Sequence, residues 1–396
     1  NSCSLPSQSI TQSTMSIMVN GQERDFRLSV PSSDAGTKLA LIIAFHGGGG
    51  AGEDFQQQSE FDQLGEQEKF IMAYAIGEDD RTAAEGEWYL NTAATSRDDN
   101  DFTEAIVDNL SSQYCIDQSR LYGIGYSLGS MFTYEIACQL NHRFAAVASF
   151  AGTMPVDPET CELVGNMGVM HIHGKFDYII DYDDDWDWKD GEHEGVGTMS
   201  NVPGMIEAWS MRANCASSDT DSDFFLEHIT HSGCFGDTRV EHYGIEFGEH
   251  TWPDEVDGTP TYQLMWDFLS DFTNQGTCTV GDNDNSGNGN SGGGNSGGNN
   301  SGSVGEWSIS ETNYLGVRIS EILASSSGED YGGIDLDGDG EVWTNSEQYI
   351  QLTNDGTSDV DISDWILDDN PEGGSAPCSI GWNTTIAAGE SITFFR

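Results

Sequence analysis

Strand-sized apolar runs alternate with stretches of helical periodicity over the first 280 residues. The apolar runs occupy residues 39–45, 70–76, 120–126, 144–150, 169–173 and 242–247. Residues 101–114 carry Phe102, Ile106, Val107 and Leu110 at helical spacing, and residues 202–213 and 261–272 show the same periodicity. This alternation predicts an α/β fold, with a mainly parallel sheet covered by helices on both faces and ligands at the carboxyl ends of its strands.

A change of composition divides the chain. Residues 281–303 are almost entirely Gly, Asn, Ser and Asp, which cannot bury enough apolar surface to offset the entropy lost on ordering. A Gly-rich coil of this length has a root-mean-square span of about 25 to 30 Å. We therefore expect a flexible linker between a domain at 1–280 and a second domain at 304–396.

The second domain has a different pattern. Short alternating runs at 317–322, 347–352, 360–367 and 390–395 are separated by Gly, Asn and Asp. Such spacing predicts a small all-β, immunoglobulin-like sandwich. Because the chain stops directly after an apparent strand, we expect this module to be truncated.

The charge narrows the classes of partner. Sixty-seven Asp and Glu against 14 Lys and Arg give a formal charge of −53, which repels nucleic acids and anionic lipid surfaces. Self-repulsion of this size favours a saline habitat, where salt screens it. No apolar run reaches the roughly 18 residues of a transmembrane helix. We expect no nucleic-acid partner and no membrane insertion.

The eight cysteines favour an oxidising compartment. They contain no Cys-x-x-Cys pair, so disulfides are favoured over zinc. The predicted pairs are Cys138 with Cys161, Cys215 with Cys234, and Cys3 with Cys115, which leaves Cys278 and Cys378 unassigned. The chain starts at Asn1 without a methionine, as in a mature form after removal of a secretory signal or in a cloned fragment. We expect a secreted, extracellular protein.

The strongest candidate for chemistry follows the apolar run 120–126. Gly125-Tyr126-Ser127-Leu128-Gly129 precedes a helical stretch at 128–140. A serine hydroxyl is a weak nucleophile at neutral pH, and a sharp turn from strand to helix exposes it to a neighbouring base. The pattern indicates the nucleophile elbow of an α/β-hydrolase, with Ser127 as nucleophile.

Two later strand ends supply partners in the expected order. Asp177 follows the run 169–173, and His250 lies between the last strand run and the final helix. Ser, Asp and His in this order form the triad of α/β-hydrolases, with His250 as base and Asp177 as its orienting acid. The alternatives are a surface-loop role for His250 and a triad role for Asp181 or Asp183.

A glycine run ends the first apolar strand. In residues 46–50, the absence of side chains lets backbone N–H groups approach a developing oxyanion. We expect the N–H groups of Gly48 and Leu128 to form an oxyanion hole, whereas a plain glycine turn is the simpler alternative. His46 is expected to brace this loop.

Aromatic residues flank these motifs. Trp88, Tyr126 and Trp252 are candidates for an apolar wall against an acyl or aryl group. Packing in the core explains the two tryptophans equally well.

Metal-binding patterns are weaker. His171 and His173 alternate on one strand without a third ligand at fixed spacing, and the acidic run 181–187 is typical of a solvated face, so we assign no metal to either. No cofactor is expected for catalysis. In the second domain, four acidic residues resemble the first half of a calcium loop, but its twelfth position is Ser346; the four are Asp335, Asp337, Asp339 and Glu341. This pattern predicts either a structural calcium site or a plain acidic turn.

Beyond these motifs, residues from about 14 to 273 resemble the polyhydroxybutyrate depolymerase and feruloyl esterase family of secreted α/β-hydrolases. The similarity lies in HGGGG at 46–50, DNDFTEAI at 99–106, IDQSRLYGIGYSLGSM at 116–131, RFAAVA at 143–148, HIHGKFD at 171–177, VPGMIEAW at 202–209 and HTWP at 250–253. The resemblance implies the same triad and an ester substrate. Ser130, where the family often has glycine, and the acidic segment 181–194 depart from the pattern.

Residues from about 304 to 396 resemble a lamin-tail domain. The similarity lies in VRISEI at 317–322, EQYIQLTN at 347–354, VDISDWIL at 360–367 and AAGESI at 387–392. This resemblance implies an accessory module without a catalytic role.

We therefore expect a secreted serine carboxylesterase that cleaves polyester or feruloyl-type ester bonds, with a polymeric substrate. The alternatives are a serine peptidase of the same fold and an adhesion or binding protein with an inactive hydrolase domain.

Overall fold

The protein divides into two compact units, residues 1–275 and 276–396. The structure, a computed structural model, describes residues 9–50, 52–77, 87–92, 97–161, 163, 166–188, 196–274, 279–280, 317–323, 349–362, 366–367, 378–380 and 384–395. The expected linker at 281–303 and the expected calcium residues Asp335, Asp337, Asp339 and Glu341 lie outside this part of the chain.

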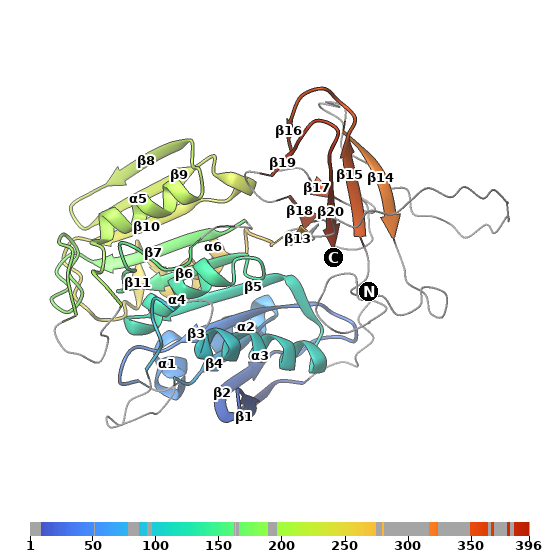
Figure 1. Cartoon of the computed structure of the whole chain (residues 1–396). Helices are drawn as coiled ribbons and strands as arrows, with labels where there is room; N and C mark the ends of the chain where they lie inside the picture. The colour runs from blue at the N-terminus through green and yellow to red at the C-terminus, as the bar shows by residue number, and fades with distance from the viewer. Residues whose placement is uncertain are drawn as a thin grey trace. The chain divides into compact units, whose positions relative to one another are not determined.

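A ten-stranded mixed sheet forms the centre of the first unit (Figure 1). Its six inner strands are parallel, and they are the six apolar runs of the sequence in the order β4-β3-β5-β6-β7-β10. Their bounds are β3 Leu39–Phe45, β4 Phe70–Ala75, β5 Ile116–Tyr126, β6 Ala146–Phe150, β7 Gly168–Gly174 and β10 Val240–Ile245. This strand order and the helical layers give the first unit an α/β-hydrolase fold.

Antiparallel strands extend the sheet at both edges. The hairpin of β1 and β2 joins β4 on one side, and β9 and β8 follow β10 on the other. Their bounds are β1 Thr11–Val19, β2 Gln22–Val30, β8 Ser217–Ser222 and β9 Leu226–Ser232. The prediction of a mainly parallel sheet therefore holds for the inner strands, and the sequence patterns missed these four.

Helices cover both faces because the inner strands alternate their side chains between two cores. Along β3, Leu41, Ile43 and Phe45 enter the core beneath α3, α4 and α5, whereas Ile42 enters the core beneath α1, α2 and α6. The first three helices are α3 Asp98–Gln113, α4 Leu128–Gln139 and α5 Val202–Arg212, and the others are α1 Gly52–Ser59, α2 Phe61–Glu68 and α6 Thr261–Leu269. Two short strands, β11 Glu255–Val256 and β12 Thr259–Pro260, lead into α6. Among the described residues, no helix is both long and apolar enough to cross a membrane.

The second unit contains only strands among its described residues. One four-stranded antiparallel sheet has the order β13-β20-β15-β14, and two further strand pairs join β16 to β19 and β17 to β18. Their bounds are β13 Thr279–Val280, β14 Val317–Leu323, β15 Tyr349–Asn354, β16 Val360–Asp361, β17 Ile366–Leu367, β18 Cys378–Ser379, β19 Thr385–Ile386 and β20 Ser391–Phe395. The lamin-tail and immunoglobulin-like assignments stay predictions.

Candidate active site

Ser127 lies in the sharp turn between β5 and α4. Its backbone has φ 54° and ψ −121°. Residues with a Cβ rarely adopt this conformation, which costs of order 1–3 kcal/mol of conformational strain. Two backbone hydrogen bonds hold the turn: the Ser127 N–H donates to Phe150 O at 2.9 Å, and the Ser127 carbonyl accepts from Met131 N–H at 3.1 Å. The strained turn presents the hydroxyl at the carboxyl end of the sheet.

The two glycines of the elbow are required by close packing. A Cβ on Gly125 would lie 2.2 Å from Gly129 O, and a Cβ on Gly129 would lie 2.1 Å from Phe45 O. Neither backbone atom can move aside cheaply. The pattern of glycines around Ser127 is thus explained by approach of strand β3 and helix α4.

The structure brings the three predicted triad side chains together. His250 Nε2 lies 2.8 Å from Ser127 Oγ, and His250 Nδ1 lies 2.6 Å from Asp177 Oδ2. Donation of Nδ1–H to the carboxylate leaves Nε2 as an acceptor facing the hydroxyl, which is the tautomer needed to remove its proton. Both partner side chains are nearly dry, since His250 is 8% exposed and Asp177 is 0% exposed.

Asp177 is held as a carboxylate by hydrogen-bond donors. Its Oδ1 accepts the backbone N–H groups of Ile179 and Ile180, both at 2.9 Å, while Oδ2 also lies 3.3 Å from His173 Nε2. Burial raises the Asp177 pKa, but the bonds from His173, His250 and Ile180 outweigh it and hold the pKa well below its usual range. The competitor Asp181 instead accepts the N–H groups of the following acidic turn in an exposed position.

A chain of buried side chains continues behind Asp177. Ser149 Oγ–H donates to Tyr134 Oη at 2.9 Å, and Tyr134 Oη lies 2.7 Å from His171 Nδ1. His171 Nε2 lies 3.0 Å from His173 Nδ1. From the sequence we assign no metal to these two histidines, and their alternation inside an apolar strand is the signal that they have partners in the interior.

The glycine loop after β3 lies against the elbow. A Cβ on Gly47 would lie 3.2 Å from Ser127 Cβ, and one on Gly48 would lie 3.4 Å from Leu128 Cδ2. Leu128 begins α4, so its N–H is among those that have no acceptor within the helix. Gly48 and Leu128, the two residues whose N–H groups we expect to bind the oxyanion, are therefore neighbours beside the nucleophile.

His46 and Trp88 hold this loop in place by hydrogen bonds. His46 Nδ1 lies 2.8 Å from Gly47 O, and His46 Nε2 lies 2.9 Å from the Gly77 N–H that donates to it. Burial lowers the His46 pKa, which favours the neutral ring that this pairing needs. Trp88 Nε1–H donates to His46 O at 2.8 Å, so both side chains fit a bracing role.

The three predicted aromatic residues occupy different positions. Trp88 and Trp252 are buried in the two cores, which fits the packing alternative for both. Tyr126 is only half-buried, and its hydroxyl donates to His250 O at 2.8 Å. Tyr126 thus fixes the backbone of the candidate base.

Two of the predicted disulfides are present, Cys138–Cys161 and Cys215–Cys234. Cys115 is also disulfide-bonded, and its expected partner Cys3 lies outside the described residues. In the described part of the chain, no group of three His, Cys, Asp or Glu side chains is placed to hold a metal ion.

The chain is similar to several known proteins. Residues 29–185 match the family model described as Phospholipase/Carboxylesterase. The chain is 27% identical over 271 residues to a putative esterase, NocK, of Nocardia uniformis subsp. tsuyamanensis, covering 63% of this chain and 76% of that protein. It is 24% identical over 255 residues to feruloyl esterase B of Piromyces equi, covering 61% of this chain and 44% of that protein. An acetyl xylan esterase from Aspergillus awamori superposes with a TM-score of 0.47 at 16% identity, over 65% of this chain and 99% of that one.

Proposed function

We propose that the protein is a serine carboxylesterase that works through an acyl-enzyme. The observation that carries the proposal is the continuous line of hydrogen bonds from Asp177 through His250 to Ser127, beside a glycine loop. The match to a carboxylesterase family model and the relatives named as esterases support it. The disulfides are compatible with secretion, which is part of the proposal.

The reaction has two steps. Ser127 Oγ attacks the ester carbonyl while His250 Nε2 takes its proton, and the N–H groups of Gly48 and Leu128 receive the negative oxygen. The alcohol leaves with the proton from His250, which forms the Ser127 acyl ester. Water then attacks this ester with His250 again as base, so the acid is released and Ser127 is regenerated.

Within the esters, the substrate class that we propose is a polyester or a feruloyl-type ester. Four exposed phenylalanines whose rings pack against one another support a polymeric, apolar substrate. Two of them lie in the loops that follow the triad strands β7 and β10, and the other two lie in the turn between β8 and β9. The four are Phe176, Phe224, Phe225 and Phe247, with exposures of 61%, 70%, 64% and 56% and ring centroids 5.1 to 6.4 Å apart in contacting pairs. Phe176 directly precedes Asp177, and its N–H donates to Gly248 O, two residues before His250.

The test is turnover of p-nitrophenyl acetate with a matched pair of serine variants. Ser127→Ala removes the nucleophile and is expected to lower kcat by about 10⁶-fold. Ser130→Ala is the control, because its hydroxyl is buried in helix α4, which begins directly after Ser127, and has no hydrogen-bond partner among the described residues. A fluorophosphonate should label wild type and Ser130→Ala but not Ser127→Ala. Turnover that survives in Ser127→Ala would refute the proposal.

A further inference from the structure

The triad carboxylate lies at the end of a buried row of polar side chains that the esterase mechanism does not use. Four members are almost fully dry: His171, His173 and Ser149 are 0% exposed, and Tyr134 is 1% exposed. Their contacts run without a gap from Ser149 to Asp177 over distances of 2.7 to 3.3 Å. Buried polar groups in such a row are expected to be specific in their donor and acceptor roles.

The direction of the row follows from what each atom can do. The Asp177 carboxylate only accepts, and the carbonyl of Ile180, 3.2 Å from His173 Nε2, also only accepts. His173 must therefore carry its proton on Nε2, which makes its Nδ1 the acceptor for His171 Nε2–H. His171 Nδ1 is then an acceptor as well, and it faces the hydroxyls of Tyr134 and Ser149 at 2.7 and 3.0 Å.

We infer that His173 is a positioning residue for the triad, and that His171 holds the His173 ring in the orientation in which Nε2–H points to Asp177. Every bond in the row donates toward the carboxylate, so each ring has one defined pair of donor and acceptor atoms. This inference rests on the proposed esterase function and adds to it two residues that touch neither substrate nor Ser127.

A neutral His171 ring suits this position. Burial, above all, lowers the His171 pKa far below its usual value, so the His171 ring stays neutral. If His171 were absent, His173 Nδ1 would lose its donor and the His173 ring would be held through Nε2 alone. The ring would then be less firmly oriented, and the Nε2–H bond that positions the Asp177 carboxylate toward His250 would weaken.

His242 offers a matched control. It is 1% exposed and stacks on His171 with ring centroids 5.7 Å apart, but its own bonds go to Tyr182 Oη at 2.8 Å and to the His171 carbonyl at 3.1 Å. It therefore belongs to the same buried cluster but not to the row that ends at Asp177.

The experiment compares four variants of the full chain by kcat and KM on p-nitrophenyl acetate. We expect His173→Phe to lower kcat about 10- to 100-fold, the loss expected for a hydrogen bond to a charged group, with little change in KM. His173→Gln, which keeps an N–H near the Nε2 position, should recover most of the loss. His171→Phe should lower kcat about 5- to 10-fold, whereas His242→Asn should keep it near the wild-type value.

A second measurement separates this inference from the proposed function. The downfield proton NMR resonance of His250 Nδ1–H, which needs no substrate, should broaden in His173→Phe and His171→Phe and persist in His173→Gln and His242→Asn. The inference would be overturned by any of three results. They are a kcat loss in His242→Asn as large as that in His171→Phe, no recovery of kcat in His173→Gln, and an unchanged His250 resonance in His173→Phe. Absence of fluorophosphonate labelling in wild type, with the resonance behaving as expected, would refute the esterase function alone.

Discussion

Acid sensitivity of the fold can be derived from one buried histidine. His242 lies on β10, and its ring is enclosed by His171, His173 and Tyr182. Burial, the largest cause, lowers the His242 pKa from 6.5 to about 3. The unfolded chain therefore binds a proton on this ring more readily than the folded protein does.

The sign and size follow from proton linkage. A lowered folded-state pKa means that stability contributed by the neutral ring is complete above pH 6.5 and is lost as pH falls from 6.5 toward 3. Each pH unit in this window costs about 1.4 kcal/mol, so acidification from pH 7 to pH 5 removes about 2 kcal/mol through His242. That is a large share of a typical stability of about 5–15 kcal/mol.

Urea unfolding at several pH values tests this derivation. His242→Asn keeps an N–H near the Nδ1 position and removes the titrating ring, so its free energy of unfolding should fall by about 2 kcal/mol less than that of wild type between pH 7 and pH 5. The comparison between variants cancels the titration of the many surface carboxylates. Equal pH slopes for the two proteins would refute the reasoning.

Two further predictions concern the surface and the core. Phe224→Ser combined with Phe225→Ser should reduce adsorption of the Ser127→Ala protein to polyester particles about tenfold, because each ring can bury about 150–250 Å² of apolar surface against the polymer. The control is Met18→Ser, since Met18 is 66% exposed at the opposite edge of the sheet. Equal adsorption of the two variants would exclude the exposed phenylalanines as a polymer-binding surface. Arg24→Met removes a buried cation 2.8 Å from Asp99 and should lower the free energy of unfolding, measured in urea, by about 3–5 kcal/mol. Lys69→Met, at the more exposed pair with Glu66, should lower it by about 0–1 kcal/mol. Similar losses for the two variants would contradict this ranking.

The inner sheet was predictable because its signal is local. Each inner strand is an apolar run bounded by polar turns, and such runs keep their meaning wherever the chain places them. Strand β8 has no such signal, since residues 217–222 are polar and fully on the surface. The β1–β2 hairpin did have one: Asn20 and Gly21, with φ of 50° and 85°, form the Asn-Gly turn typical of hairpins. The many polar residues around it obscured the alternation.

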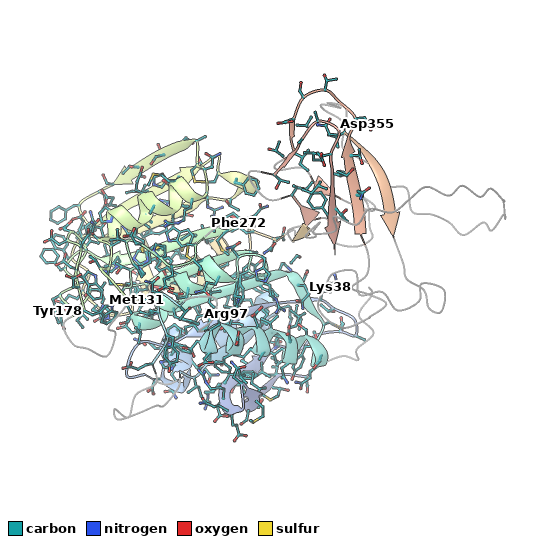
Figure 2. All side chains as sticks on the ribbon, in the orientation of Figure 1. Lys38, Arg97, Met131, Tyr178, Phe272 and Asp355 are labelled. Carbon is teal, nitrogen blue, oxygen red and sulfur yellow. A yellow bond between two sulfur atoms is a disulfide. The ribbon has the colours of Figure 1, made fainter. Side chains whose placement is uncertain are left out.

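The triad was predictable for a related reason. Its members follow β5, β7 and β10, so the order of the strands was enough to place Ser127, Asp177 and His250 together at the carboxyl ends of the parallel strands. The row behind Asp177 was not predictable, because its donor directions depend on which buried rings face one another across β6, β7 and α4. Figure 2 shows how densely side chains fill this unit, with Tyr178 at its outer edge, 80% exposed only one residue from the buried Asp177.

The acidity of the chain gives this row a further meaning. With 14 Lys and Arg for 67 Asp and Glu, most surface carboxylates depend on salt for screening, whereas the described donors to Asp177 are two backbone N–H groups and two imidazoles. Short hydrogen bonds in a dry interior are screened little by ions, unlike the exposed pairs. We therefore expect the orientation of the Asp177 carboxylate to depend less on salt concentration than that of a surface carboxylate paired with a lysine or arginine.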